Sequence, residues 1–289
     1  MLDLSVVVPV RNAEDLIEGC LDSIVRAEPR EIIVVDGLSG DGTLEIARGY
    51  PVRLLSDEGR GLPAARLLGA QVASSPWVAL IDADVLLPDG ALADLLEEFK
   101  QGRFTGLQAG LASTSGPGYW GRALVHHHRS GRSKNWFGVV ATIFERETLL
   151  EHGFDERFRS GEDWELRWRL ERAGAKLGVS RRTVVTHRFG DSFSFARGQW
   201  LADGRGLARL IRKQGWRAGH LVGLPLAATI RGILLSLVRV QPRWIPYYLC
   251  YGAFNYVAML DELVEGSKRR IPTKRHDDRE QEALPDEAP

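Results

Sequence analysis

Two carboxylates separated by a single residue follow an apolar run near the middle of the N-terminal half. Asp82 and Asp84 come directly after Val78–Ile81, with Ala83 between them. Carboxylates in this arrangement can hold Mg²⁺ or Mn²⁺ against the phosphates of a nucleotide diphosphate, where the metal neutralises the leaving group. A D-x-D pair alone recurs by chance, so its position after a strand-like run is what gives it weight.

A second candidate site lies in the segment VVDGLSGDGT, residues 34–43. Asp36 follows an apolar run and precedes a glycine-rich turn. A carboxylate at this position can accept hydrogen bonds from a base or ribose while the glycine backbone passes close to the ligand. The same residues would also suit a turn capped by an Asp side chain with no ligand.

The elements that must position these residues are visible in the first 110 residues as βαβαβαβ. Continuous apolar strands alternating with helices indicate a parallel sheet covered on both faces, which binds ligands beyond the carboxyl ends of its strands. Three of the four strand ends carry acids, so an anionic ligand there requires a divalent cation. The predicted strands are Leu4–Val8, Ile32–Val35, Val52–Leu55 and Val78–Ile81, and the predicted helices are Ala13–Arg26, Thr43–Ala47, Ala64–Ala73 and Ala91–Lys100.

The next 80 residues are less regular. Residues 102–121 are rich in Gly and Ser and predict a loop with one or two short strands. The triplet His126–His128 is interpreted as part of a mobile basic loop over the active site that meets an acceptor phosphate. Further along, the pattern predicts helices over Phe144–His152 and Glu162–Ala173 and a strand over Leu177–Val185.

Five segments, in order, resemble glycosyltransferase family 2: SVVVPVRNAE, VVDGLSGDGT, AARLLGAQVA, VALIDADVLLP and GFDERFRSGEDWELRWRLERAG. The resemblance covers about residues 4–190. It implies the α/β GT-A fold, with a Rossmann-like, mainly parallel sheet and helices on both faces, a nucleotide-sugar donor, a divalent metal and inversion at the anomeric carbon. The donor-binding residues that it implies are Pro9, Arg11, Asp36, Arg66, Asp82, Ala83 and Asp84.

The same resemblance assigns roles around the acceptor and the metal. Asp163 matches the general base that takes a proton from the acceptor hydroxyl. Glu162 matches the acceptor side, although a carboxylate at a helix N-terminus also suits the helix dipole without any ligand. Trp164 either stacks on a sugar or packs in the core. The implied metal ligands are Asp84, Asp82 and His187; His187 could also be structural.

Two departures from the family pattern narrow the expectation. Leu67 follows Arg66 where the family usually has Asn, so one donor contact is missing. Processive members carry Gln-x-x-Arg-Trp, whereas this chain has Arg197-Gly198-Gln199-Trp200. Transfer of a single sugar is therefore expected in place of polymer synthesis.

The charge is unevenly distributed, although 38 basic residues balance 38 acidic ones overall. Residues 181–243 hold twelve Lys and Arg against two Asp, which favours a phosphate-bearing substrate or a membrane surface as partner. Nucleic acid is disfavoured because the arginines adjoin the apolar runs Leu221–Val238 and Trp244–Leu260. Both runs are marginal for spanning, and their aromatic and basic flanks suggest helices in the cytoplasmic leaflet. A buried helical hairpin and a dimer interface are the alternatives.

Together these patterns predict a glycosyltransferase domain over 1–190, a basic and apolar helical membrane-associating region over 191–265 and a disordered tail over 266–289. We expect a peripheral or monotopic enzyme at the cytoplasmic face of the membrane, with Mn²⁺ or Mg²⁺ and a lipid-linked or saccharide acceptor. An inactive membrane-associated scaffold of the same fold is one alternative. A sugar-phosphate nucleotidyltransferase is another, but its glycine-rich N-terminal loop is replaced by Pro9–Asn12. A dinucleotide-binding dehydrogenase is disfavoured because Asp57 and Glu58 would crowd its pyrophosphate.

Overall fold

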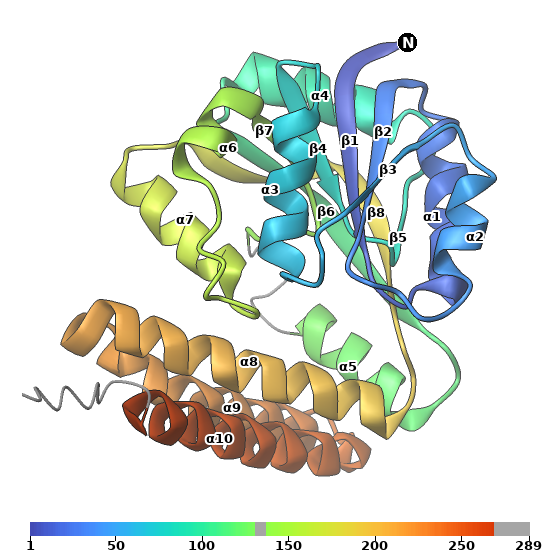
Figure 1. The fold of residues 1–289 in the computed structure, drawn as a ribbon. Helices are drawn as coiled ribbons and strands as arrows, with labels where there is room; N and C mark the ends of the chain where they lie inside the picture. The colour runs from blue at the N-terminus through green and yellow to red at the C-terminus, as the bar shows by residue number, and fades with distance from the viewer. Residues whose placement is uncertain (131–136, 269–289) are drawn as a thin grey trace, which may run out of the picture.

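A computed structural model describes residues 1–130 and 137–268, and its N-terminal part is built on an eight-stranded sheet (Figure 1). The strand order is β3-β2-β1-β4-β7-β6-β8-β5. Neighbours among β1, β2, β3 and β4 are parallel, as are β6 and β8, while β7 and β5 run antiparallel to their neighbours. The strands are β1 (Leu2–Val10), β2 (Pro29–Asp36), β3 (Arg53–Ser56), β4 (Trp77–Ile81), β5 (Val85–Leu86), β6 (Gly106–Ser115), β7 (Ala141–Glu145) and β8 (Leu177–Phe189).

Helices cover both faces of this sheet, which confirms the predicted α/β class. Successive residues of a strand point to opposite faces, so Val6 and Val8 of β1 pack into one apolar layer and Val7 packs into the other. Gly69 lets one helix approach β1 closely, because a Cβ there would overlap Val7. The first layer holds α1 (Glu14–Val25), α2 (Thr43–Arg48) and α4 (Ala91–Gly102); the second holds α3 (Leu62–Val72), α6 (Arg146–His152) and α7 (Glu162–Arg172).

A helical layer follows the last long strand and lies beneath the sheet, with α5 (Tyr119–Ser130) between them (Figure 1). Its own apolar cores include Trp200, Tyr247 and Tyr248 against α5, and Phe158, Leu207 and Met259 near α7. The change of architecture after Phe189 lies close to the predicted boundary at residue 190. The helical layer consists of α8 (Phe193–Gln214), the 3₁₀ helix η2 (Gly215–Gly223), α9 (Leu224–Val238), the 3₁₀ turn η3 (Pro242–Trp244) and α10 (Ile245–Lys268).

Several local predictions were wrong. The helix predicted over Phe144–His152 begins only at Arg146, because the β-branched and aromatic run before it pairs with β4 as strand β7. The loop predicted around His126–His128 is helix α5, whose inner side packs on the helical layer. The loop with one or two short strands predicted over residues 102–121 is one ten-residue strand, β6, followed by the start of α5. Helix α10 continues to Lys268, past the predicted start of the tail; residues 269–289 and 131–136 lie outside the described residues.

Candidate functional site

A pocket of about 340 Å³ opens beyond the carboxyl ends of β1 and β2 and is called the β1–β2 pocket below. The predicted Pro9 and Arg11 line it, and Gly37 lies directly after the buried Asp36. Both carboxylate oxygens of Asp36 accept a hydrogen bond from Ser39 N at 3.2 Å. This side chain therefore stabilises the turn that follows β2. The complete lining is Pro9, Val10, Arg11, Gly37, Asp57, Gly59, Gly61, Leu62, Ala65 and Arg159.

Asp57 organises the opposite wall of this pocket and was not among the predicted site residues. Its two carboxylate oxygens accept from Gly59 N and Gly61 N, both at 2.8 Å. Both glycines have positive φ, +75° and +104°, which is the backbone region that favours glycine. The sequence did hold a signal for this role, because Asp57 directly follows a strand and precedes Gly59-Arg60-Gly61. From the sequence alone, these residues served only as an argument against a dinucleotide site.

Arg66 joins three distant parts of the sheet domain. Its guanidinium is buried, with Nη2 2.7 Å from Asp82 Oδ1 and Nη1 2.8 Å from Glu162 Oε1. The predicted donor-side residue Asp82 and the predicted acceptor-side residue Glu162 therefore meet at one arginine. Burial raises the pKa of Asp82 to about 6; Arg66 opposes this shift, and the charge of Asp84 adds to it. In this structure Glu162 holds Arg66 and is buried.

Asp84 meets the predicted His187 because the short strand β5 pairs with β8. Val85 lies opposite His187 in that register, and His187 Nε2 is 3.1 Å from Asp84 Oδ2. Burial alone would lower the pKa of His187, but the hydrogen bond and charge of Asp84 raise it overall. Arg188, which sequence reasoning missed, fixes the turn by donating Nη2 to Ala83 O at 3.1 Å and its backbone N to Asp84 O at 2.9 Å.

The predicted metal set divides into two pairs in this structure. Asp84 contacts His187, whereas Asp82 is held by Arg66. Among the residues that the structure describes, no three His, Cys, Asp or Glu side chains form a ready metal cluster. Asp84 Oδ1 is nevertheless buried without a hydrogen-bond partner. One or two protein ligands with the remaining positions filled by substrate phosphates and water are typical for Mg²⁺, so this donor set fits a metal that arrives with its phosphates.

Asp163 lies in the first turn of α7, after Gly161. Gly161 has φ +75° and packs directly on Gly206 of α8, so the start of α7 is fixed against the helical layer. Asp163 Oδ1 accepts from Trp164 N at 2.8 Å. Burial and then the charge of Glu162 raise the pKa of Asp163 to about 7, which places a proton acceptor near neutrality. Trp164 packs at the edge of the apolar cluster around Phe158 and Leu207.

The helical layer adds one carboxylate that sequence reasoning missed. Asp203 of α8 has no hydrogen-bond or ion-pair partner in the described part of the chain, and its charge contributes to the raised pKa of Asp163. Although the side chain is solvent-exposed, the protein around it displaces enough water to raise the pKa of Asp203 to about 6. Asp203 is the only acid in the basic helix α8, and that isolation was the available sequence signal.

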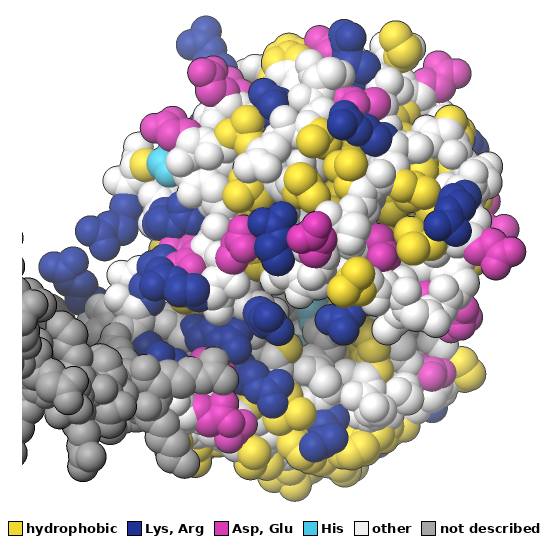
Figure 2. Space-filling view, viewed as in Figure 1, with side chains coloured by type: hydrophobic (Ala, Val, Ile, Leu, Met, Phe, Trp, Pro, Cys, Tyr) yellow, Lys and Arg dark blue, Asp and Glu magenta, His cyan; other side chains and the backbone are white. Residues whose placement is uncertain are grey.

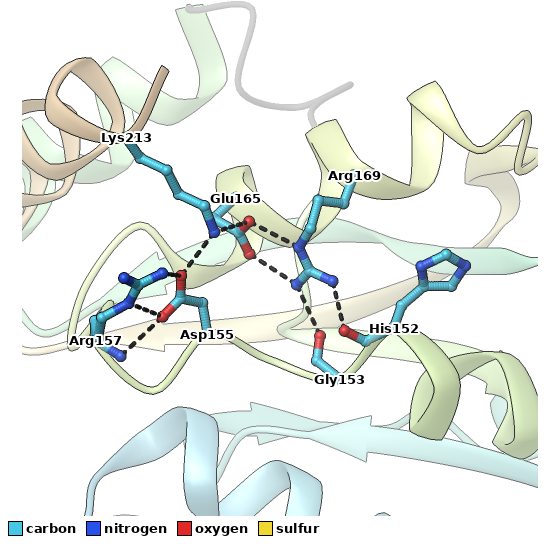
Figure 3. Close-up of polar contacts among 7 residues, drawn as sticks. All are labelled: His152, Gly153, Asp155, Arg157, Glu165, Arg169 and Lys213. Atoms are coloured by element: carbon cyan, nitrogen blue, oxygen red, sulfur yellow. Dashed lines mark hydrogen bonds and ion pairs between the residues drawn. The ribbon is translucent and has the colours of Figure 1, made fainter. Parts of the chain in front are cut away.

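A groove of about 910 Å³ lies between the loop before α7 and helices α8 and α10, and we call it the α8–α10 groove. Figure 2 shows Lys and Arg side chains gathered where the sheet domain meets the helical layer. Most of the cations that line the groove are neutralised: Lys213 contacts Asp155 and Glu165 at 2.6 Å, as Figure 3 shows. Arg159 lines both this groove and the β1–β2 pocket, so the two cavities adjoin.

Glu165 is the centre of the network in Figure 3 and connects α7 to its surroundings. It is fully buried and receives Lys213 on one side and Arg169, at 2.7 Å, on the other. Arg169 also donates to the carbonyl oxygens of His152 and Gly153. These contacts hold the helix that carries Asp163 against both α6 and α8.

Known proteins match this chain in both sequence and fold. The uncharacterized glycosyltransferase YibD of Escherichia coli K12 is 39% identical over 88 residues, which are 28% of this chain and 26% of that protein. The succinoglycan biosynthesis protein ExoA of Rhizobium meliloti (strain 1021) is 28% identical over 285 residues, covering 88% of this chain and 85% of that protein.

A solved structure supports the fold over nearly the whole described chain. The mannosyltransferase PcManGT from Pyrobaculum calidifontis, solved with GDP-Man and Mn²⁺, has a TM-score of 0.65 at 22% identity and covers 89% of this chain and 87% of that one. The predicted GT-A architecture is thus confirmed. The family model for glycosyl transferase family 2 matches residues 5–162, which hold the β1–β2 pocket, Arg66 and the D-x-D pair. The chain therefore belongs to glycosyltransferase family 2.

Proposed function

We propose that this protein moves a single sugar from a nucleotide-diphosphate sugar to a hydroxyl or phosphate acceptor, with inversion at the sugar carbon. The observation that carries the proposal is the buried Arg66, whose two ion pairs join the D-x-D segment to the first turn of α7. Donor-side and acceptor-side carboxylates are thereby held in one cluster. The β1–β2 pocket, with Pro9, Arg11 and Asp57, would take the nucleoside.

Asp84 and His187 would hold a divalent cation, with Asp82 close to the ribose or the metal. A bound cation would neutralise the charge that develops on the leaving diphosphate. The buried, unpaired Oδ1 of Asp84 supports this role, because a buried carboxylate oxygen without a partner is costly unless a ligand completes it. The Mn²⁺ in the complex of PcManGT is consistent with such an ion.

Asp163 would act as the general base. It would take the proton from the acceptor hydroxyl as that oxygen attacks the sugar carbon on the side opposite the diphosphate. The pKa of about 7 suits this task, since a base must be ionised at working pH yet still hold the proton that it accepts. Asp203, across from α7, would help to bind or orient the acceptor. The adjoining α8–α10 groove offers room for the rest of that molecule.

We further propose that the helical layer lies on the cytoplasmic face of a membrane, next to a lipid-linked acceptor. Arg217–Val238 is the one described segment long and apolar enough to span, with mean hydropathy 2.0, but only its last 15 residues form the α-helix α9. Such a helix is about 22 Å long, shorter than the hydrocarbon core. One side of α9 packs on α10, where Gly232 meets the ring of Tyr248. The opposite side exposes an apolar row at helical spacing, Leu226, Ile230, Leu234 and Leu237.

The proposed reaction is tested by measuring donor binding and transfer separately. Thermal shift and calorimetry with UDP, GDP, CDP, dTDP and their sugars, each with and without Mn²⁺, would identify a ligand that stabilises the native state. We expect one base to bind with metal dependence, and Asp84→Ala to remove that dependence. Asp89→Ala, an exposed carboxylate outside the site, is the matched control. Asp163→Asn should retain donor binding and lose transfer.

If none of these nucleotides stabilises folded wild-type protein, the transferase proposal is wrong and the inactive scaffold is favoured. If a donor binds but Asp163→Asn transfers sugar at the wild-type rate, the assignment of the base is wrong while the donor site stands.

A further inference from the structure

A cavity of about 560 Å³ lies between the end of β6, helix α5 and the connection from α9 to α10, and it shares no lining residue with the β1–β2 pocket or the α8–α10 groove. Its charged lining consists of Arg122, Arg129, Arg239 and Arg243, with His126 beside them and no Asp or Glu among its described lining residues. We call it the arginine pocket.

The charges in the arginine pocket are largely unneutralised. Within residues 1–130 and 137–268, the guanidinium groups of Arg122 and Arg239 have no hydrogen-bond or ion-pair partner, and Arg243 contacts only the face of Trp244. Arg129 donates Nη2 to Ser113 O at 3.2 Å. In the α8–α10 groove, by contrast, four of the six cations have carboxylate partners. Four like charges facing one cavity repel one another, and a bound anion relieves that repulsion.

The walls of the arginine pocket are built from stacked aromatic rings. Trp244 is buried and stacks on His126 at 4.9 Å and on Tyr119 at 5.9 Å between ring centroids. Tyr119 OH donates to Arg243 O at 2.6 Å, which ties α5 to η3. Burial is the main cause that lowers the pKa of His126, and the charges of Arg239 and Arg243 lower it further. The cavity is therefore formed by the fold itself before any ligand binds.

Exposed apolar side chains stand beside the same arginines. Leu237, Val238 and Val240 are 55%, 79% and 84% exposed, and the last two flank Arg239 in sequence. They continue the apolar row of α9. A cationic pocket at the edge of an exposed apolar surface matches an amphiphile with an anionic head and a hydrocarbon tail. A soluble phosphate would have no use for that apolar border.

We propose that the arginine pocket binds the phosphate of an anionic membrane lipid and so fixes the helical layer on the bilayer surface. Guanidinium groups suit this ligand because their paired N–H donors match phosphate oxygens. The inference rests on the membrane association proposed above. The proposed membrane contact through the apolar row of α9 is general, and the arginine pocket would add a specific site for a lipid headgroup.

The test compares full-length variants in vesicle sedimentation, using phosphatidylcholine with and without phosphatidylglycerol. Arg239→Gln/Arg243→Gln should weaken binding to the anionic vesicles roughly 30-fold. The matched control, Arg181→Gln/Arg182→Gln, removes the same charge from exposed positions on β8 and should change binding little. Arg239→Lys/Arg243→Lys should recover only part of the affinity, because an ammonium group cannot make the bidentate contact. Circular dichroism spectra and thermal unfolding transitions that match those of wild type would show that the variants are folded.

The outcomes separate this inference from the proposed function. Equal losses in the pocket and control pairs, or full recovery by lysine, would overturn the headgroup site and leave only general surface charge. Failure of wild-type protein to bind either vesicle would overturn the proposed membrane location. In that case inorganic phosphate is titrated into wild type and Arg239→Gln/Arg243→Gln by calorimetry. Phosphate binding that the double variant abolishes would assign the pocket to a soluble phosphate and refute the proposal that it binds a lipid. Donor binding is measured in the same preparations, so the transferase proposal is judged independently.

Discussion

Replacing Arg66 by Met tests the ion-pair cluster that supports the proposed site. Met has a similar length but no charge, so the variant leaves the carboxylates of Asp82 and Glu162 without their shared partner. The side chains of Arg66 and Glu162 are 2% and 9% exposed, and that of Asp82 is 23% exposed. Removing one member of a buried ion pair costs about 3–5 kcal/mol, since the remaining charge stays desolvated. We expect the free energy of unfolding to fall by that amount.

The stability lost in Arg66→Met should depend on pH, whereas the stability lost by forming a cavity alone should not. Arg66 lowers the pKa of Asp82, so without Arg66 the native pKa of Asp82 rises further above its unfolded value. A carboxyl group whose native pKa is raised destabilises the fold increasingly as pH rises above its unfolded pKa of about 3.9. The cost of Arg66→Met relative to wild type should therefore be larger at about pH 8 than at about pH 5.

Urea unfolding followed by circular dichroism at both pH values measures this cost. Arg60→Met is the matched control, because Arg60 pairs with Glu156 at 3.8 Å with half-exposed side chains and should cost less than about 1 kcal/mol. The double variant Arg66→Met/Glu162→Gln should be at least about 1 kcal/mol more stable than Arg66→Met, since it removes one stranded charge. A loss no larger than that of Arg60→Met, or a loss independent of pH, would refute the reasoning.

Two further predictions concern the proposed base and its support. The pH profile of kcat/KM should rise through about pH 7 in wild type, and Asp163→Asn should lower the rate at least about 100-fold. The same variant should be more stable than wild type by a margin that grows from about pH 4 and is complete above about pH 7, because the raised native pKa of Asp163 no longer opposes folding. Gly206→Ala should reduce transfer and stability, since its Cβ would approach Gly161 Cα at 3.1 Å, whereas Gly198→Ala on the same helix meets nothing within 4 Å and should be neutral or stabilising. Steady-state kinetics across pH and thermal unfolding of the four proteins check both; a flat profile or equal effects of the two alanines would contradict them.

The sequence was most informative where a strand is buried on both faces. The run around Val6–Val8 could only be a central strand, and the acids after such strands had to gather at one edge of the sheet. The sequence was misleading where the local pattern fits both a helix and a strand. Phe144 lies in such a run, and it belongs to a strand because it pairs opposite Val78 of β4. His126–His128 look polar in sequence but cover an aromatic core, which no local pattern reveals.

The site shows the same division between local and tertiary information. Asp84 and Asp163 were predicted because each lies in a recognisable motif, one shortly after β4 and the other in the first turn of α7. Three neighbouring residues were not predicted, because only tertiary packing brings them to the candidate site. Arg188 bonds the backbone beside Asp84, the charge of Asp203 acts on Asp163, and Arg159 lines the β1–β2 pocket. Glu162 was matched to the acceptor side, and the structure pairs it with Arg66, a residue 96 positions away.

The close contact between Gly161 and Gly206 joins the helix that carries the proposed base to the helical layer. A Cβ at Gly161 would lie 2.9 Å from Gly206 Cα, and one at Gly206 would lie 3.1 Å from Gly161 Cα, so an added side chain would press the two backbones apart. The first turn of α7 can therefore keep its position only while α8 keeps its own, and α8 is packed on α10 beneath it. If lipid phosphate holds that layer at the membrane, the bilayer fixes the height at which Asp163 meets an acceptor. Vesicles should then raise kcat/KM for a lipid-linked acceptor and leave the affinity for the donor nucleotide unchanged.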